Sequence, residues 1–156
     1  MKTRTKVLAF AVTAGFALSA GAQELTWRSN IAPIVKKGCS ECHGVEAPEF
    51  GDWMLLPDAK RKKEGPRMDT YTTFIGYVAW PATGAVMRRL DDGVAAGGKP
   101  GNMYKYLGDT DAERAANLKT IKAWLGEGAW NLNRFETRGS VPGITKEQLA
   151  NIKAKY

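Results

Sequence analysis

The stretch KKGCSECHGV, residues 36–45, contains both cysteines and the only histidine of a 156-residue chain. These three residues, Cys39, Cys42 and His43, lie within five positions. If the chain is exported, as its N-terminus indicates below, two cysteines are compatible with one disulfide. A zinc site is excluded by ligand count, because no second cluster supplies a fourth ligand. A redox dithiol of the thioredoxin kind would require a βαβ context, and the sequence around the motif is not strand-like.

The pattern that remains is Cys-x-x-Cys-His, the attachment sequence of c-type haem. Two thiols add across the two vinyl groups of the porphyrin, and the histidine that follows can place its imidazole on the iron. The sequence therefore predicts that Cys39 and Cys42 bind one haem c covalently, with His43 as the proximal iron ligand. A disulfide or a chance match is the alternative interpretation.

Residues 1–22 have the layout of a secretory signal peptide. Three basic residues precede an apolar run, residues 7–20, that is too short to span a bilayer comfortably, and small residues follow at Ala20–Ala22. We therefore expect a mature chain of residues 23–156 that is exported to the periplasm, with an uncleaved membrane anchor as the alternative. Export agrees with haem attachment, because this type of haem is attached outside the cytoplasm.

The charge distribution gives no support for nucleic-acid binding. The full chain has 23 basic and 16 acidic residues, a net charge of +7, and three of the basic residues lie within residues 1–22. The mature chain therefore carries a net charge of +4. Its densest basic cluster, AKRKKEG at 59–65, is short and fits a solvated loop or helix face. At most, this excess steers an acidic protein partner toward the chain.

Hydrophobic periodicity predicts a helix that enters the haem motif. Its apolar residues recur at helical spacing, at Trp27, Ile31, Ile34 and Val35. Ser29 or Asn30 is expected to cap the N-terminus of this helix, and Pro33 is tolerated in its first turn.

The region after the motif is longer and less regular. Gly44–Gly65 is polar and contains prolines, so we expect mostly loop there. Apolar spacing predicts helices within residues 67–80 and 82–93, ended by Pro81 and Gly93 respectively.

The clearest helix follows a loop rich in glycine and proline. Thr110-x-x-Glu113 forms a capping box at its start. Its apolar stripe consists of Ala115, Leu118, Ile121, Trp124 and Leu125. A second capping box, Thr145-x-x-Gln148, predicts a short terminal helix with Leu149 and Ile152 facing inward.

No segment has convincing strand alternation, so the expected fold class is all-α. The helices are expected to pack around haem in a single domain, residues 23–156. Residues 131–156 form a C-terminal helical extension of this domain.

With these motifs the chain resembles the single-haem class I c-type cytochromes. Similar cytochromes have a Gly-rich loop with a ligand methionine, then an acidic helix start, then a helix ending in W-[IL]-x-x-G-A. Here these features are Gly98–Met103, Asp109–Glu113 and Trp124–Ala129. The resemblance implies a cytochrome c-like fold in which this last core helix crosses the first. The middle region, 45–95, is longer than in the smallest members.

The resemblance also implies a sixth iron ligand. A second histidine from the same chain is impossible, because the chain has one. Met103 occupies the position in the Gly/Pro loop where the family places its ligand methionine. Met87, which lies beside apolar residues on an expected helix, is the second choice and more typical of core packing. Met54 could pack against the porphyrin, and an open iron site is a further alternative.

The expected function is one-electron transfer between redox partner proteins, without catalytic residues. An iron with both axial positions filled by the protein changes its charge by one electron and binds no substrate. The alternatives are a haem subunit or small enzyme with an open or displaceable sixth site, and a gas-binding haem protein. Membrane contact is expected only by association with a respiratory complex, for which residues 45–95 and 131–156 offer surfaces.

Overall fold

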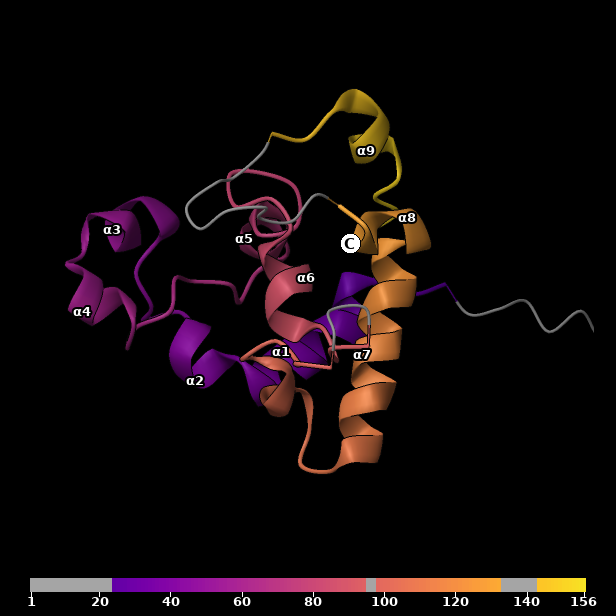
Figure 1. The fold of residues 1–156 in the computed structure, drawn as a ribbon, viewed down its shortest axis with the longest axis horizontal. Coiled ribbons are helices and arrows are strands. Elements are labelled where there is room, and N and C mark those ends of the chain that lie inside the picture. Colours follow the sequence, from indigo (N-terminus) through magenta and orange to yellow (C-terminus); the bar gives the residue numbers. More distant parts are fainter. Residues whose placement is uncertain (1–23, 95–97, 133–142) are drawn as a thin grey trace, which may run out of the picture.

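The computed structural model describes residues 24–94, 98–132 and 143–156, so the expected signal peptide lies outside the described residues. All regular elements of the described part are helical, which confirms the all-α prediction (Figure 1). In chain order they are η1 (Trp27–Ile31), α1 (Ala32–Gly38), α2 (Ser40–His43), α3 (Phe50–Leu55), α4 (Asp58–Arg61), α5 (Tyr71–Gly76), α6 (Ala85–Leu90), η2 (Tyr104–Leu107), α7 (Asp111–Leu125), α8 (Glu127–Trp130) and α9 (Lys146–Ala150).

The helix before the motif starts earlier than expected. The Thr26 hydroxyl accepts a hydrogen bond from the Ser29 N–H at 3.2 Å, so Thr26 is the N-cap, and the expectation of Ser29 or Asn30 was wrong. The Asn30 side chain accepts from the Thr26 N–H at 2.9 Å, which closes the cap from the other side. The first turn, η1, is a π-helix that continues directly into α1.

The longest helix, α7, forms the other half of the core. The Thr110 hydroxyl caps it by accepting from the Glu113 N–H at 3.1 Å, as predicted, but the full capping box is not formed, because the Glu113 carboxylate accepts from the Asp109 N–H at 2.9 Å and not from the Thr110 N–H. Four residues of the expected stripe are buried, namely Leu118, Ile121, Trp124 and Leu125, while Ala115 is exposed. Gly126 ends the helix with φ of 92°, a left-handed conformation that glycine adopts without strain. Helix α7 contacts η1, and Figure 1 shows it beside α1.

Three aromatic residues from three elements join these helices. The ring centroids of Trp27 in η1, Phe74 in α5 and Trp124 in α7 lie 5.3 to 6.0 Å apart, in tilted arrangements. Each such pair adds about 0.5–1.5 kcal/mol to the stabilisation from burial alone. The core is therefore centred where η1 and α7 meet α5.

The C-terminal residues 153–156, here called the strap, bind this aromatic cluster through hydrogen bonds. The carbonyl oxygen of Lys155 accepts two hydrogen bonds, from the Trp27 N–H at 2.7 Å and from the Trp124 Nε1–H at 2.8 Å. Upstream of the strap, α9 has its predicted capping box. Leu149 is 53% exposed, so the inward placement expected for it was wrong, whereas Ile152 is partly buried against the core, as expected.

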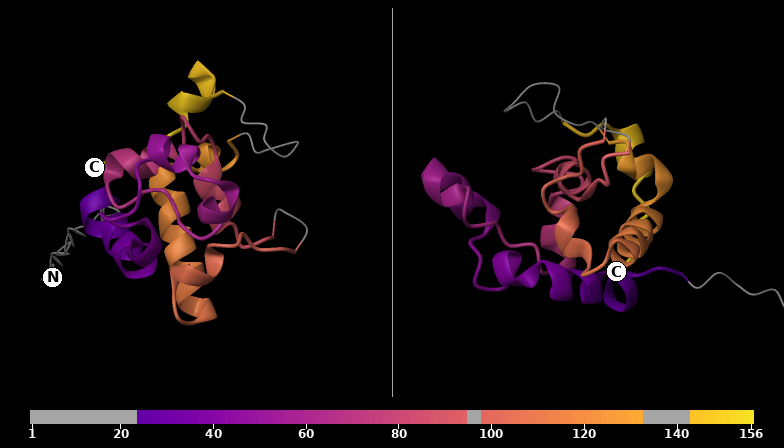
Figure 2. Two further views of the ribbon diagram at one scale, coloured as in Figure 1. Left: turned by 90° about the vertical axis from the view of Figure 1, so that its left-hand side faces the viewer. Right: turned by 60° about the horizontal axis from the view of Figure 1, so that its bottom comes forward.

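The middle region contains two helices where a loop was expected. Helices α3 and α4 form an arm, residues Phe50–Arg61, that extends away from α7 in Figures 1 and 2. The Trp53 Nε1–H donates to the Glu64 carbonyl at 2.6 Å and closes the arm on itself. None of the helices in the described part is long and apolar enough to span a membrane.

Candidate functional site

The haem motif lies at the junction of α1 and α2. Cys39 ends α1 and begins α2, and its carbonyl oxygen accepts from the N–H groups of Cys42 at 3.2 Å and His43 at 2.9 Å. The motif therefore forms one helical turn, which brings both thiols and the imidazole to one short segment. Cys39 and Cys42 form no disulfide with each other. Burial raises the pKa of the Cys39 thiol to about 11, whereas Cys42 is exposed.

The imidazole of His43 is oriented from a distant loop. Its Nδ1 atom lies 2.7 Å from the carbonyl oxygen of Pro66, which can only accept, so Nδ1 carries the hydrogen and donates it. Nε2 then keeps its lone pair, the form in which histidine binds metals. Such a second bond fixes both the tautomer and the ring orientation of a metal-binding histidine.

A glycine also packs closely against this ring. A Cβ atom at position 65 would lie 2.0 Å from Cε1 of His43 and 2.7 Å from Nε2, so any larger residue would displace the ring or the loop. Sequence reasoning missed both residues, since it placed Gly65 at the end of an expected loop and gave Pro66 no role. The Gly-Pro pair itself was the available signal, because it marks a backbone with a fixed turn.

The Met103 loop is fastened to the end of α6. The Met103 N–H donates to the Arg89 carbonyl at 2.9 Å, and the Gly101 N–H donates to the Asp91 carbonyl at 2.8 Å. A Cβ atom at position 101 would lie 2.3 Å from the Arg89 oxygen, so glycine permits this close approach. Met103 itself is partly buried against the core at the start of η2.

The other methionines have different surroundings. Met87 is fully buried in the core on α6, which agrees with the packing role expected of it. Met54 lies on the arm and is 48% exposed, and Met68 is partly buried.

A close backbone contact holds the Met103 loop against the motif. A Cβ atom at position 38 would lie 2.1 Å from the Tyr106 carbonyl oxygen, so Gly38 lets η2 approach the end of α1 directly before Cys39. Lys37 adds two ion pairs across this contact, 3.0 Å from Asp109 and 2.6 Å from Glu113. These bonds raise the pKa of Lys37 and lower the pKa of Glu113.

The arrangement fits a covalently attached haem. Two thiols and one imidazole nitrogen with its lone pair available lie in one helical turn, and the imidazole has the hydrogen bond expected of an iron ligand. The loop that carries the Met103 thioether is held next to the same turn. These residues match the donor set of a haem c with histidine and methionine ligands.

Comparison with known proteins identifies the family. Residues 26–156 match the family model described as PccH Cytochrome c. Among solved structures, the monoheme cytochrome PccH from Geobacter sulfurreducens is similar, with 47% sequence identity and a TM-score of 0.71. That alignment covers 85% of this chain and 99% of the other. No curated protein matches the chain.

These matches confirm the predicted single-haem c-type cytochrome and its cytochrome c-like fold. The protein holds one covalently bound haem c with its iron, and it transfers electrons rather than acting as an enzyme. With 47% identity over nearly the whole of its structural relative, the chain belongs to the PccH cytochrome c family.

Proposed function

We propose that the protein is an exported one-electron carrier whose haem is attached through Cys39 and Cys42, with His43 and Met103 as the iron ligands. The observation that carries this proposal is the 2.7 Å contact between His43 Nδ1 and the Pro66 carbonyl. It leaves Nε2 as the metal-binding atom and gives the imidazole a fixed direction. The bound haem supplies an iron that gains and loses one electron.

The protein contributes attachment, orientation and shielding. Two thioether bonds retain the group in an environment where free haem would be lost. The Pro66 carbonyl accepts from His43 Nδ1 and Gly65 packs closely against the same ring, so the proposed ligand needs little rearrangement when the iron charge changes. The apolar core beside Cys39 lowers solvent access, which is one of the factors that set a haem potential.

Met103 is the proposed sixth ligand, with Met87 as the second choice. The loop of Met103 is fixed to α6 and, through η2, to the residue before Cys39. A thioether ligand raises the reduction potential of haem iron relative to a second histidine. Complete burial of Met87 among core residues favours a packing role for its side chain.

Export and partners complete the proposal. Residues 1–22 have the pattern of a signal peptide, so we infer cleavage before Gln23 and a periplasmic location. The partners are redox proteins that donate and accept electrons, without nucleic acid, and membrane contact occurs only through a respiratory complex. The mass of the exported protein, compared with the sum of residues 23–156 and one haem, tests both cleavage and attachment.

The ligand assignment is tested by the visible spectrum of the reduced protein before and after adding carbon monoxide. An unchanged spectrum is expected for the native protein, because both axial positions are filled. Met103→Ala is expected to bind carbon monoxide, whereas Met87→Leu keeps the native response. Carbon monoxide binding by native protein would instead support an open site, and binding only by the Met87 variant would make Met87 the ligand.

Attachment has its own control. Cys39→Ala and Cys42→Ala are each expected to leave the haem with one thioether bond, detectable as a shifted pyridine haemochrome band. Ser40→Ala, inside the same turn, should keep the native band. A native band in both cysteine variants would contradict the assignment of Cys39 and Cys42.

A further inference from the structure

One buried hydroxyl in the structure has no partner. Tyr77 follows α5, and its side chain is only 6% exposed. Its Oη atom is the one buried side-chain nitrogen or oxygen atom of the described part that makes no hydrogen bond. Leaving such a group unsatisfied is unfavourable, and native structures contain few of them.

Other aromatic donors of the core do have partners. Trp124 donates to the Lys155 carbonyl at 2.8 Å, Trp130 donates to the Asp91 carboxylate at 3.2 Å, and Tyr71 donates to the Ala154 carbonyl at 3.3 Å. The fold therefore supplies acceptors where aromatic polar groups are buried. Tyr77 stands out as a donor whose acceptor is not part of the described protein.

The position of Tyr77 links it to the His43 loop. Phe50, at the start of α3, packs edge-on against the Tyr77 ring with centroids 5.7 Å apart. Glu49, the residue before Phe50, forms an ion pair with Arg67 at 3.1 Å. The Arg67 N–H also donates to the Pro48 carbonyl at 2.9 Å. Arg67 directly follows Pro66, the acceptor for His43. Tyr77 thus contacts Phe50 and His43 contacts Pro66, and the ion pair between Glu49 and Arg67 joins the neighbours of these two residues.

The environment keeps Tyr77 a donor. Burial raises the pKa of its hydroxyl far above the ordinary value, and the negative charge of Glu49 raises it further. The phenol is therefore neutral throughout the physiological range and can give its hydrogen to an anion. Glu49 is the charged group that acts on Tyr77, and its carboxylate is already paired with Arg67.

We propose that the Tyr77 hydroxyl donates a hydrogen bond to a propionate carboxylate of the haem, which makes Tyr77 a positioning residue for the cofactor. The inference rests on the proposed haem site at Cys39–His43. A haem is apolar except at its iron and its two propionates, so a propionate is the acceptor that this cofactor offers. A donor to an ionised carboxylate stabilises the charged form and fixes the orientation of the ring edge.

The first test uses the native reduced protein in proton NMR. The expected result is a slowly exchanging Tyr77 hydroxyl proton with a nuclear Overhauser effect to a propionate methylene. A rapidly exchanging hydroxyl without that effect would overturn the proposal and assign the hydroxyl to water. This measurement does not depend on whether a variant folds.

The second test compares Tyr77→Phe with the matched variant Tyr71→Phe. Tyr71 is the first residue of α5, the helix that Tyr77 follows, and its hydroxyl already has the Ala154 carbonyl as acceptor. Tyr77→Phe is expected to move the propionate titration, followed as the pH dependence of the reduction potential, upward by about one pH unit, a tenfold change in proton affinity. Tyr71→Phe is expected to leave it in place.

The inference would be overturned if the propionate of Tyr77→Phe titrated at the same pH as in the native protein and the two proteins had equal haem contents. The proposed haem site would not be affected by that result. Absence of haem from the native protein would contradict the proposed function itself. The two failures are therefore distinguishable.

Discussion

The Nδ1 atom of His43 and the carbonyl oxygen of Pro66 lie 2.7 Å apart, although 23 positions separate the two residues along the chain. This bond orients the proposed iron ligand, because it selects the tautomer in which Nε2 can bind iron. The Met68 N–H also donates to the His43 carbonyl at 2.9 Å, so side chain and backbone are held by the same loop.

Substitution of Gly65 is expected to disturb this ligand. In Gly65→Ala the new Cβ would lie 2.0 Å from Cε1 of His43, so the ring or the loop must move. Overpacking of this kind costs about 1–3 kcal/mol. We expect an altered visible spectrum of the covalently attached haem and a lower melting temperature, measured by absorbance and calorimetry.

Gly51→Ala is the matched control for this change. Gly51 is exposed on α3, with no atom within 4 Å of the added Cβ. Alanine favours a helix over glycine by about 0.5–1 kcal/mol, so this variant should keep the native spectrum and lose no stability. A native spectrum in Gly65→Ala would show that the loop does not set the ring orientation.

The second prediction concerns the Met103 loop. In Gly101→Ala the Cβ would lie 2.3 Å from the Arg89 carbonyl, which also accepts from the Met103 N–H. The loop must shift away from α6 and carry the proposed ligand with it. We expect measurable carbon monoxide binding by the reduced variant, with the haem still attached. Failure of carbon monoxide to bind would mean that the position of Met103 does not depend on this contact.

Local signals made part of this structure predictable. The motif and the capping residues Thr110 and Thr145 act over three or four positions, so the sequence indicates them without tertiary information. The apolar stripes of η1 and α7 were found for the same reason, because a helix that packs on a core must repeat its apolar residues at 3.6-residue spacing.

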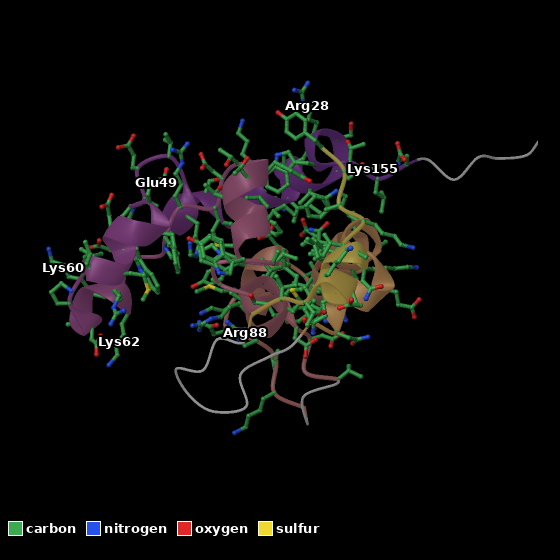
Figure 3. The ribbon with its side chains drawn as sticks, turned by 90° about the horizontal axis from the view of Figure 1, so that it is seen from above. Arg28, Glu49, Lys60, Lys62, Arg88 and Lys155 are labelled. Atoms are coloured by element: carbon green, nitrogen blue, oxygen red, sulfur yellow. The ribbon has the colours of Figure 1, made fainter. Side chains whose placement is uncertain are left out.

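The features that were missed depend on distant contacts. Helices α3 and α4 have no side-chain caps and no buried residues, so neither left a periodic or capping signal in the sequence. The roles of three glycines follow from tertiary contacts that the sequence does not show. These contacts are Gly38 with Tyr106, Gly65 with His43 and Gly101 with Arg89. Figure 3 shows Lys60 and Lys62 at the outer part of the arm and Glu49 nearer the body, a separation that composition alone does not reveal.

The third prediction concerns the strap at residues 153–156. Deleting these residues removes the Lys155 carbonyl and leaves the Trp124 Nε1–H and the Trp27 N–H without their acceptor. Loss of these bonds and of the Tyr156 ring contact should lower the free energy of unfolding by about 2–4 kcal/mol. Urea denaturation of the haem-loaded protein measures this change.

Deletion of Tyr156 alone is the control for the strap. It removes the ring contact with Tyr71 but keeps the Lys155 carbonyl, so less than half of the loss is expected. Equal losses in the two deletions would contradict the assigned role of the Lys155 carbonyl.

The last prediction concerns the pH dependence of the contact between α1 and α7. Glu113 accepts hydrogen bonds from Lys37 and from the Asp109 N–H, and these bonds lower the pKa of its carboxyl below the ordinary value of 4.5. A carboxylate with a lowered pKa stabilises the folded state above its ordinary pKa, and this contribution disappears as the pH falls through the lowered value. Lys37 has a raised pKa, so its contribution is complete below its ordinary value of 10.5 and is lost as the pH rises through the raised value.

Glu113→Gln is therefore expected to be less stable than the native protein at neutral pH and to approach it in acid, below the lowered pKa of Glu113. Glu46→Gln is the control, because the exposed Glu46 carboxylate has no ion-pair partner within the described ranges, and it should follow the native curve at every pH. Melting temperatures between pH 3 and 8, at low and high salt, measure the difference, and high salt should reduce it because the Lys37 ion pairs are exposed. A stability difference that persisted unchanged into acid would mean that Glu113 acts through its side-chain packing, since the charge that distinguishes it from glutamine is then gone.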